Sequence, residues 1–87
     1  MKNIEIVENF IKSGKSCKSN NLENIKVYCN LSVLYSYNAK IAVLQNSICI
    51  INKKWLHYSK TTQTHINKVK TLCKQNNIPV EYATLCD

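Results

Sequence analysis

Apolar residues near the N-terminus recur at helical spacing. The stripe consists of Ile4, Val7, Phe10 and Ile11. This spacing predicts a short amphipathic helix over residues 3–13. Asn3 is placed to cap it, and Gly14 is placed to end it in the left-handed conformation. The polar residues that follow, 15–24, are predicted to form a loop.

Farther along the chain, the apolar pattern changes from a period of 3.6 to a period of two. Residues 25–37 alternate in this way around Asn30, which is placed to bend or interrupt the run. Turns are expected at Asn38, at Gln45-Asn46 and at residues 52–54. Further strands are predicted at residues 41–44, 47–51 and 55–58.

A second helix is predicted over residues 61–76. Its apolar stripe consists of Ile66, Val69, Leu72 and Cys73. Thr61 or Thr62 is placed to cap this helix, and Pro79 cannot continue it. Residues 80–85 are expected to form a final edge strand.

This order of elements predicts one small α+β domain over residues 1–87. It comprises a short N-terminal helix, an antiparallel sheet of three to four strands, a C-terminal amphipathic helix and the final edge strand. The helices are expected to pack on one face of the sheet. Oligomeric state is not indicated by this pattern.

The charge of the chain comes from lysine alone. Twelve lysines and no arginine stand against five acids, which gives a net charge of +7. The span from Asn24 to Val80 contains no acid, so this part of the chain carries a positive field that attracts phosphates or acidic proteins. The absence of arginine argues against sequence-specific reading of DNA bases. Abundant Lys, Asn and Ile also fit an AT-rich gene, so codon bias with a solvated lysine surface is the alternative.

Two properties of the chain bear on its location. It has no apolar run near the ~18 residues that a membrane span requires. Glu5 and Glu8 interrupt the N-terminal segment where a secretion signal needs continuous apolar residues. We therefore expect no membrane partner and a cytoplasmic location, which the phage resemblance described below places in the host cell.

The cysteines and histidines invite a test for metal binding. Cys49, His57, His65 and Cys73 are spaced evenly by eight residues and make up a zinc-type ligand set. Structural zinc sites usually pair their ligands two to five residues apart, so we expect no metal and read the cysteines as reduced and mostly buried.

Catalysis is also not indicated by the residue pattern. His65 falls within the apolar stripe of its helix, which favours a packed histidine bonded to backbone or to a hydroxyl. No acid lies between Glu23 and Glu81 to orient a histidine. We therefore predict a protein that is not an enzyme and has no cofactor.

Three segments of the chain resemble a group of small uncharacterised phage proteins. The segments are Gly14 to Lys18, then Leu34 to Ala42, then Ile51-Asn52 followed by Tyr58 to His65. The pattern of that group is an upstream "GKSAK-GN", then "LYSYNTxIA", then "VN…YSxTTSKH". Ala39 stands here where Thr is usual, and Gln63-Thr64 replaces Ser-Lys. The resemblance implies a viral accessory protein. By analogy of class, it suggests an antagonist of host defence such as an anti-CRISPR.

The start of the second helix is the candidate binding site. Its hydroxyl groups can cap the helix, and free N–H groups at a helix start attract anions. Nearby lysines and tyrosines add charge and stacking surfaces. The candidate residues are Lys53, Lys54, Tyr58, Ser59, Lys60, Thr61, Thr62, Lys68, Lys70 and Lys74.

Three functions follow as hypotheses. The first is inhibition of a host defence protein or nucleoprotein complex by direct binding. The second is lysine-driven, sequence-nonspecific binding to the RNA or DNA backbone. The third is capture of a nucleotide defence signal at the helix start.

Overall fold

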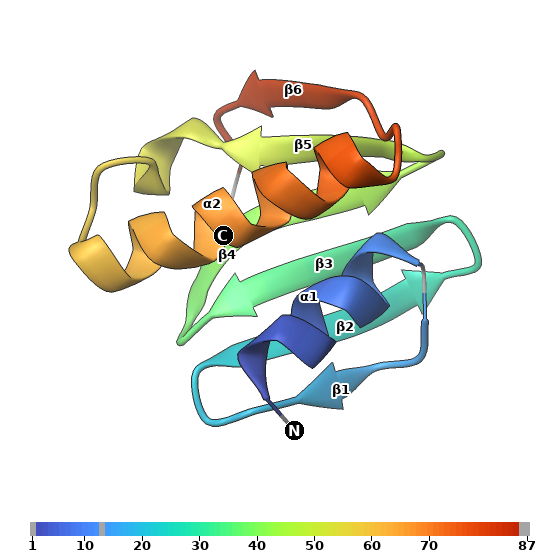
Figure 1. Ribbon diagram of the computed structural model, residues 1–87, viewed down its shortest axis with the longest axis horizontal. Helices are drawn as coiled ribbons and strands as arrows, with labels where there is room; N and C mark the ends of the chain where they lie inside the picture. Colours follow the sequence, from blue (N-terminus) through green and yellow to red (C-terminus); the bar gives the residue numbers. More distant parts are fainter. Residues whose placement is uncertain (1, 13, 86–87) are drawn as a thin grey trace.

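The computed structural model describes residues 2–12 and 14–85. In this part of the chain, two helices lie on one face of a six-stranded sheet (Figure 1). The predicted α+β class, N-terminal helix, C-terminal helix and final strand are confirmed. The elements are α1 (Asn3–Ile11), β1 (Cys17–Lys18), β2 (Leu22–Tyr28), β3 (Leu31–Ser36), β4 (Ala39–Gln45), β5 (Ile48–Asn52), the 3₁₀ turn η1 (Lys53–Trp55), α2 (Lys60–Gln75) and β6 (Val80–Ala83).

The order of the strands in the sheet follows their order in the chain. Strands β1 to β5 form an antiparallel meander, whereas β6 runs parallel to β5. The parallel pair follows from the connection, since α2 carries the chain back along the sheet before β6 begins. The prediction of three to four antiparallel strands plus a final edge strand was therefore too low in strand number, since five strands form the meander and β6 is the final edge strand.

The core lies between the helices and one face of the sheet. Alternate residues of the strands point toward the helices, as period-two geometry requires. The predicted stripes are buried except at two positions: Ile4 is 39% exposed, with Ile6 in the core instead, and Leu72 is only partly buried. The fully buried core side chains include Phe10, Leu22, Leu34, Ile51 and Val69.

The ends of α1 differ from their prediction. Lys2 is the N-cap residue, and its backbone N–H donates to the Glu5 carboxylate at 3.0 Å. Asn3 is already helical, and its side chain accepts a hydrogen bond from Ser19 Oγ instead. The helix ends at Ile11, residue 13 lies outside the described residues, and Gly14 does not adopt positive φ.

Gly14 is needed for close packing rather than for a left-handed turn. A Cβ atom at this position would clash with the Asn9 side-chain amide. The Asn9 side-chain amide donates to the Lys15 carbonyl and to Cys17 Sγ. The missing side chain therefore lets Asn9 tie the end of α1 to β1.

Helix α2 begins one residue earlier than its pattern predicted. Its N-cap is Ser59, whose Oγ accepts from the Thr62 backbone N–H at 3.1 Å, so neither Thr61 nor Thr62 is the cap residue. At the other end, Asn76 is the C-cap and Asn77 adopts positive φ, as expected for residues that end a helix.

Two segments were assigned wrongly from the sequence. Residues 55–58, predicted as a strand, belong to η1 and the turn that follows it. Residues 15–24, predicted as a loop, contain β1 and the first residues of β2. The β4–β5 turn lies at Asn46-Ser47, one residue later than expected, and both residues have positive φ.

No helix among the described residues is long and apolar enough to cross a membrane.

Asn52, at the end of β5, fixes three backbone segments at once. Its amide donates to the Lys40 carbonyl at 2.8 Å, and its Oδ1 accepts from the N–H groups of Lys54 and Leu85. The residue is fully buried, so these bonds replace water for groups that would otherwise be unsatisfied.

We expect Asn52→Ala to lower the free energy of unfolding by about 2–3 kcal/mol, because it leaves buried backbone groups without partners. Urea denaturation measures this change. Asn67→Ala, an exposed site on α2, is the matched control and should change stability by less than about 0.5 kcal/mol. An equal effect at both sites would contradict the role given to Asn52.

Candidate functional site

A pocket of about 450 Å³ opens between the β3–β4 turn and the start of α2. Its walls come from two segments, residues 36–39 and 58–62, that are about twenty residues apart in the chain. Trp55, the only tryptophan of the sequence, also lines the pocket. The lining residues are Ser36, Tyr37, Asn38, Ala39, Trp55, Tyr58, Ser59, Thr61 and Thr62.

Two buried hydroxyl groups lie at the base of the pocket. Ser36 and Thr62 are 1% and 3% exposed, respectively. The Ser59 hydroxyl donates to Thr62 Oγ1 at 3.0 Å while it accepts from the Thr62 backbone. The polar base is thus held by hydrogen bonds within the protein, which fixes the start of α2.

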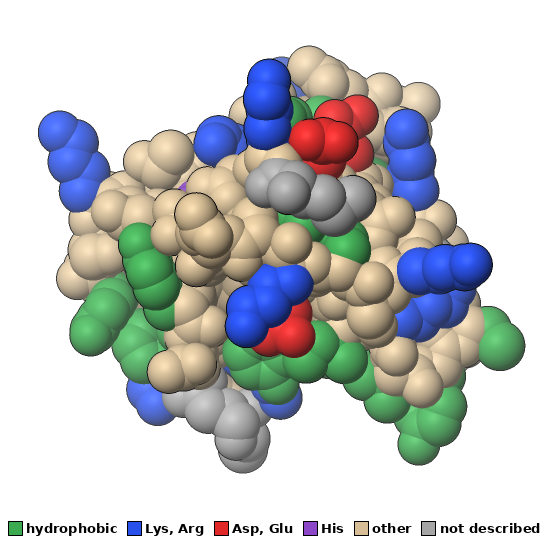
Figure 2. All heavy atoms as spheres, turned by 90° about the horizontal axis from the view of Figure 1, so that it is seen from below, with side chains coloured by type: hydrophobic (Ala, Val, Ile, Leu, Met, Phe, Trp, Pro, Cys, Tyr) green, Lys and Arg blue, Asp and Glu red, His purple; other side chains and the backbone are tan. Residues whose placement is uncertain are grey.

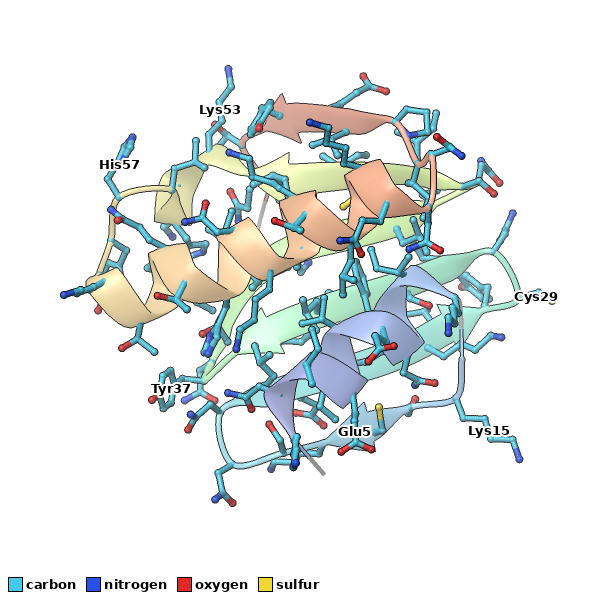
Figure 3. The ribbon with its side chains drawn as sticks, in the orientation of Figure 1. Glu5, Lys15, Cys29, Tyr37, Lys53 and His57 are labelled. Carbon is cyan, nitrogen blue, oxygen red and sulfur yellow. The ribbon has the colours of Figure 1, made fainter. Side chains whose placement is uncertain are left out.

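Aromatic side chains form the rim. Trp55 and Tyr58 pack edge to face, with ring centroids 4.8 Å apart. The ammonium group of Lys54 lies 4.9 Å from the centre of the Trp55 ring. Tyr37 and Tyr58 are 59% and 68% exposed, and Figure 3 shows Tyr37 projecting from the β3–β4 turn. Exposed tyrosines beside a tryptophan are typical of surfaces that bind other molecules.

The backbone of Tyr37 is strained. Its φ is +56°, a left-handed conformation that two-residue hairpin turns usually give to Gly, Asn or Asp. The Tyr37 N–H donates to the Asn21 carbonyl at 2.8 Å, which helps to hold this turn. A bulky residue kept in such a conformation suggests a role for its side chain beyond folding.

Beneath the pocket, His65 connects the site to the N-terminal helix. His65 is 3% exposed, and its Nδ1 lies 2.8 Å from Ser36 Oγ. Its Nε2 lies 3.5 Å from the Asn3 side-chain amide. This confirms the prediction of a packed histidine bonded to a hydroxyl group.

The neighbouring bonds define which ring nitrogen of His65 carries the proton. Ser19 Oγ accepts from the Leu22 N–H at 3.0 Å and donates to Asn3 Oδ1 at 2.6 Å. The NH₂ group of Asn3 therefore faces Nε2, which must accept, and Nδ1 carries the proton and donates to Ser36. Burial lowers the pKa of His65 below its ordinary value, and the nearby Lys68 charge adds to this effect. His65 is thus held neutral.

The structure divides the sequence-predicted binding residues into two groups. Tyr58, Ser59, Thr61 and Thr62 line the pocket, and Lys60 is exposed in the first turn of α2 beside them. Lys53 and Lys54 lie in η1, where Lys54 covers Trp55.

The remaining lysines of α2 lie away from the pocket. Lys68 lines a separate pocket of about 460 Å³ with Ile4 and Leu72. Lys70 lies 5.7 Å from the Tyr82 ring centre on the opposite flank of α2, and Lys74 is exposed near the end of the helix. On the side of the molecule that Figure 2 shows, the lysines are likewise spread out rather than gathered in one patch.

The evenly spaced cysteines and histidines do not come together as one site. Cys49 and Cys73 meet in the core, where their thiol–thiol hydrogen bond and burial raise the pKa of Cys49. His65 is bonded to Ser36, and His57 is exposed and points outward (Figure 3). Among residues 2–12 and 14–85, no three His, Cys, Asp or Glu side chains are grouped as metal ligands. Cys86 lies outside the described residues.

Sequence reasoning did not assign the β3–β4 turn and Trp55 to the site. The signal for the turn was present, since Ser36 to Ala39 belong to the "LYSYN" segment that recurs together with "YSxTT". The two segments come together only through the sheet register and the packing of α2 on the sheet, and neither segment determines these by itself.

A family model matches residues 6–84, a range that includes every residue of the pocket. The chain belongs to DUF8033, a family of unknown function. Comparison of this DUF8033 protein with curated proteins finds no match, and comparison with solved structures finds none.

We expect Tyr37→Gly to stabilise the DUF8033 protein by about 1 kcal/mol, because glycine adopts positive φ without the steric cost that tyrosine bears. Tyr28→Gly is the matched control, since Tyr28 is 67% exposed and does not have positive φ. It should destabilise the strand. Urea denaturation of both variants provides the measurement, and a loss of stability in Tyr37→Gly would show that the turn is not strained.

We also expect stability to fall as the pH drops below about 6.5, the ordinary pKa of histidine. Because the folded state holds His65 at a lower pKa, the unfolded chain binds the proton more readily in this range. One such group can contribute at most about 1.4 kcal/mol per pH unit. Unfolding measured at several pH values in His65→Gln should lack this contribution. His57→Gln, at the exposed histidine, should keep it, and an equal loss in both variants would refute the assignment.

Proposed function

We propose that this protein is a non-enzymatic phage accessory protein that inhibits a host defence complex of the CRISPR type by binding it in the host cytoplasm. The recognition site is the pocket between the β3–β4 turn and α2. The observation that carries the proposal is the convergence of the two recurring segments on this one pocket.

The chemistry of the pocket favours binding over catalysis. The two exposed tyrosines offer large, rigid contact surfaces that lose little conformational entropy on binding. The hydroxyl groups of Ser36 and Thr62 are engaged in hydrogen bonds within the protein. Both ring nitrogens of His65 are likewise occupied, so the groups around the pocket support its shape.

The host partner is a defence protein or nucleoprotein complex. This choice rests on the resemblance to small phage proteins and on the exposed aromatic rim. The scattered lysines favour it over nonspecific binding to an RNA or DNA backbone, because backbone binding requires a continuous positive track.

Capture of a nucleotide defence signal is the second candidate for the same pocket. The Trp55 and Tyr58 rings offer stacking surfaces, and Lys60 lies in the adjacent first turn of α2. This ligand would bind the isolated protein, whereas the leading proposal requires a macromolecular partner.

Co-purification with purified CRISPR effectors and phage plating on hosts that carry them test the leading proposal. Wild type should bind an effector and protect phage. Tyr37→Ala and Tyr58→Ala should each weaken binding at least tenfold, as expected for interface tyrosines. The matched control Tyr82→Ala, on β6, should bind like wild type. Absence of binding and protection across several effectors would refute the proposal, and calorimetric heat with cyclic nucleotides would favour the second candidate.

A further inference from the structure

The sheet face opposite α1 and α2, here called the helix-free face, is apolar across its centre. Figure 1 shows both helices on the other face. The register aligns four β-branched residues on neighbouring strands, and strand alternation places them on the helix-free face, where Val33 is buried by its neighbours and the other three are partly buried. This central row consists of Ile25, Val33, Val43 and Ile50.

Further apolar and aromatic residues extend the central row along the strands. Tyr35 lies two residues beyond Val33 on β3. Two residues before Val33, on the other side of the central row, a second row crosses the same strands. That second row contains Tyr28, Leu31 and Ile48, paired through Gln45. An antiparallel sheet with one face in water normally alternates apolar with polar residues, so this pattern is typical of a sheet covered on both faces.

The charges on the helix-free face balance, unlike those of the whole chain. Register places Lys18 opposite Glu23 and Lys40 opposite Tyr35, and Glu81 lies beside Ile50. Two lysines and two glutamates thus share a face in a chain of net charge +7. Codon bias alone would give this face the same lysine excess as the rest of the chain, whereas here the two lysines are balanced by two glutamates.

We propose that a second copy of this chain covers the helix-free face, with the two sheets packed face to face around a two-fold axis that runs along the strands. Such an axis places β1 of one copy over β6 of the other. Lys18 lies on β1 and Glu81 on β6, so the two edges carry opposite charges. A two-fold interface needs this self-complementarity, and aligned sheets pack in this manner.

The dimensions and charge of the face suit this occupant. The two longer extents of the molecule, 29 and 27 Å, lie in the plane of the sheet. A face of this size offers on the order of the 800 Å² per partner that a stable interface buries. Two copies with net charge +7 can approach through a neutral face while most of their lysines point outward.

Sedimentation velocity over a range of concentrations tests the dimer. Wild type should sediment as a dimer. Val43→Lys, in the central row, should be monomeric. Thr71→Lys adds the same charge at an exposed site on α2 and should remain a dimer. Circular dichroism and thermal unfolding establish whether each variant is folded.

Charge reversal at the rim keeps the test decisive even if Val43→Lys does not fold. Lys18 and Glu81 are exposed, so their substitution leaves the core intact. Lys18→Glu and Glu81→Lys should each weaken dimerisation about tenfold, because symmetry turns two attractive contacts into repulsive ones. The double variant should restore it. A wild type that stays monomeric at all concentrations, or single variants without effect, would overturn the proposal.

Discussion

The hydrogen bond between Ser36 Oγ and His65 Nδ1 joins the end of β3 to the first turns of α2 inside the core. Much of the candidate site depends on it, since Ser36 begins the β3–β4 turn and His65 lies three residues after Thr62. The same imidazole contacts Asn3, and Asn3 in turn accepts from Ser19. One short polar chain therefore links both helices to the sheet. Because Ser36 and His65 are buried, each must keep its partner, and this sets where α2 begins relative to the turn.

The sequence predicted those parts of the fold whose periodicity is long and regular. The stripe of Ile66, Val69 and Cys73 identified α2 to within one residue at each end. Segments whose structure depends on distant partners were missed. Strand β1 has only two residues and gains its bonds from β2, while residues 55–58 had too short a pattern to distinguish a strand from a 3₁₀ turn. The direction of β6 depended on the crossover through α2 rather than on its own residues.

The sequence predicted which chemical groups mark the candidate site, but it did not predict which residues line the pocket. The hydroxyl cluster marked the start of α2, although Ser59 rather than its threonines became the cap. The lysines illustrate the opposite case. They stand close together in the chain, yet at 100° per residue Lys68 and Lys70 fall on opposite flanks of α2. Tyr37 joined the pocket only because a strained turn places its ring beside the helix.

The parallel pairing of β6 with β5 also bears on the order in which the protein folds. Strands β1 to β5 pair with their immediate neighbours in the chain, so their contacts close short loops. Pairing of β6 with β5 instead closes a long loop that contains all of α2, because the register joins Cys49 to Val80. Such a non-local pairing has a larger loop-closure entropy cost than a hairpin, and contacts of this kind slow folding. During synthesis β6 also leaves the ribosome after the meander and α2. The meander can therefore assemble first, and its β5 edge waits with unpaired backbone groups until the final strand arrives.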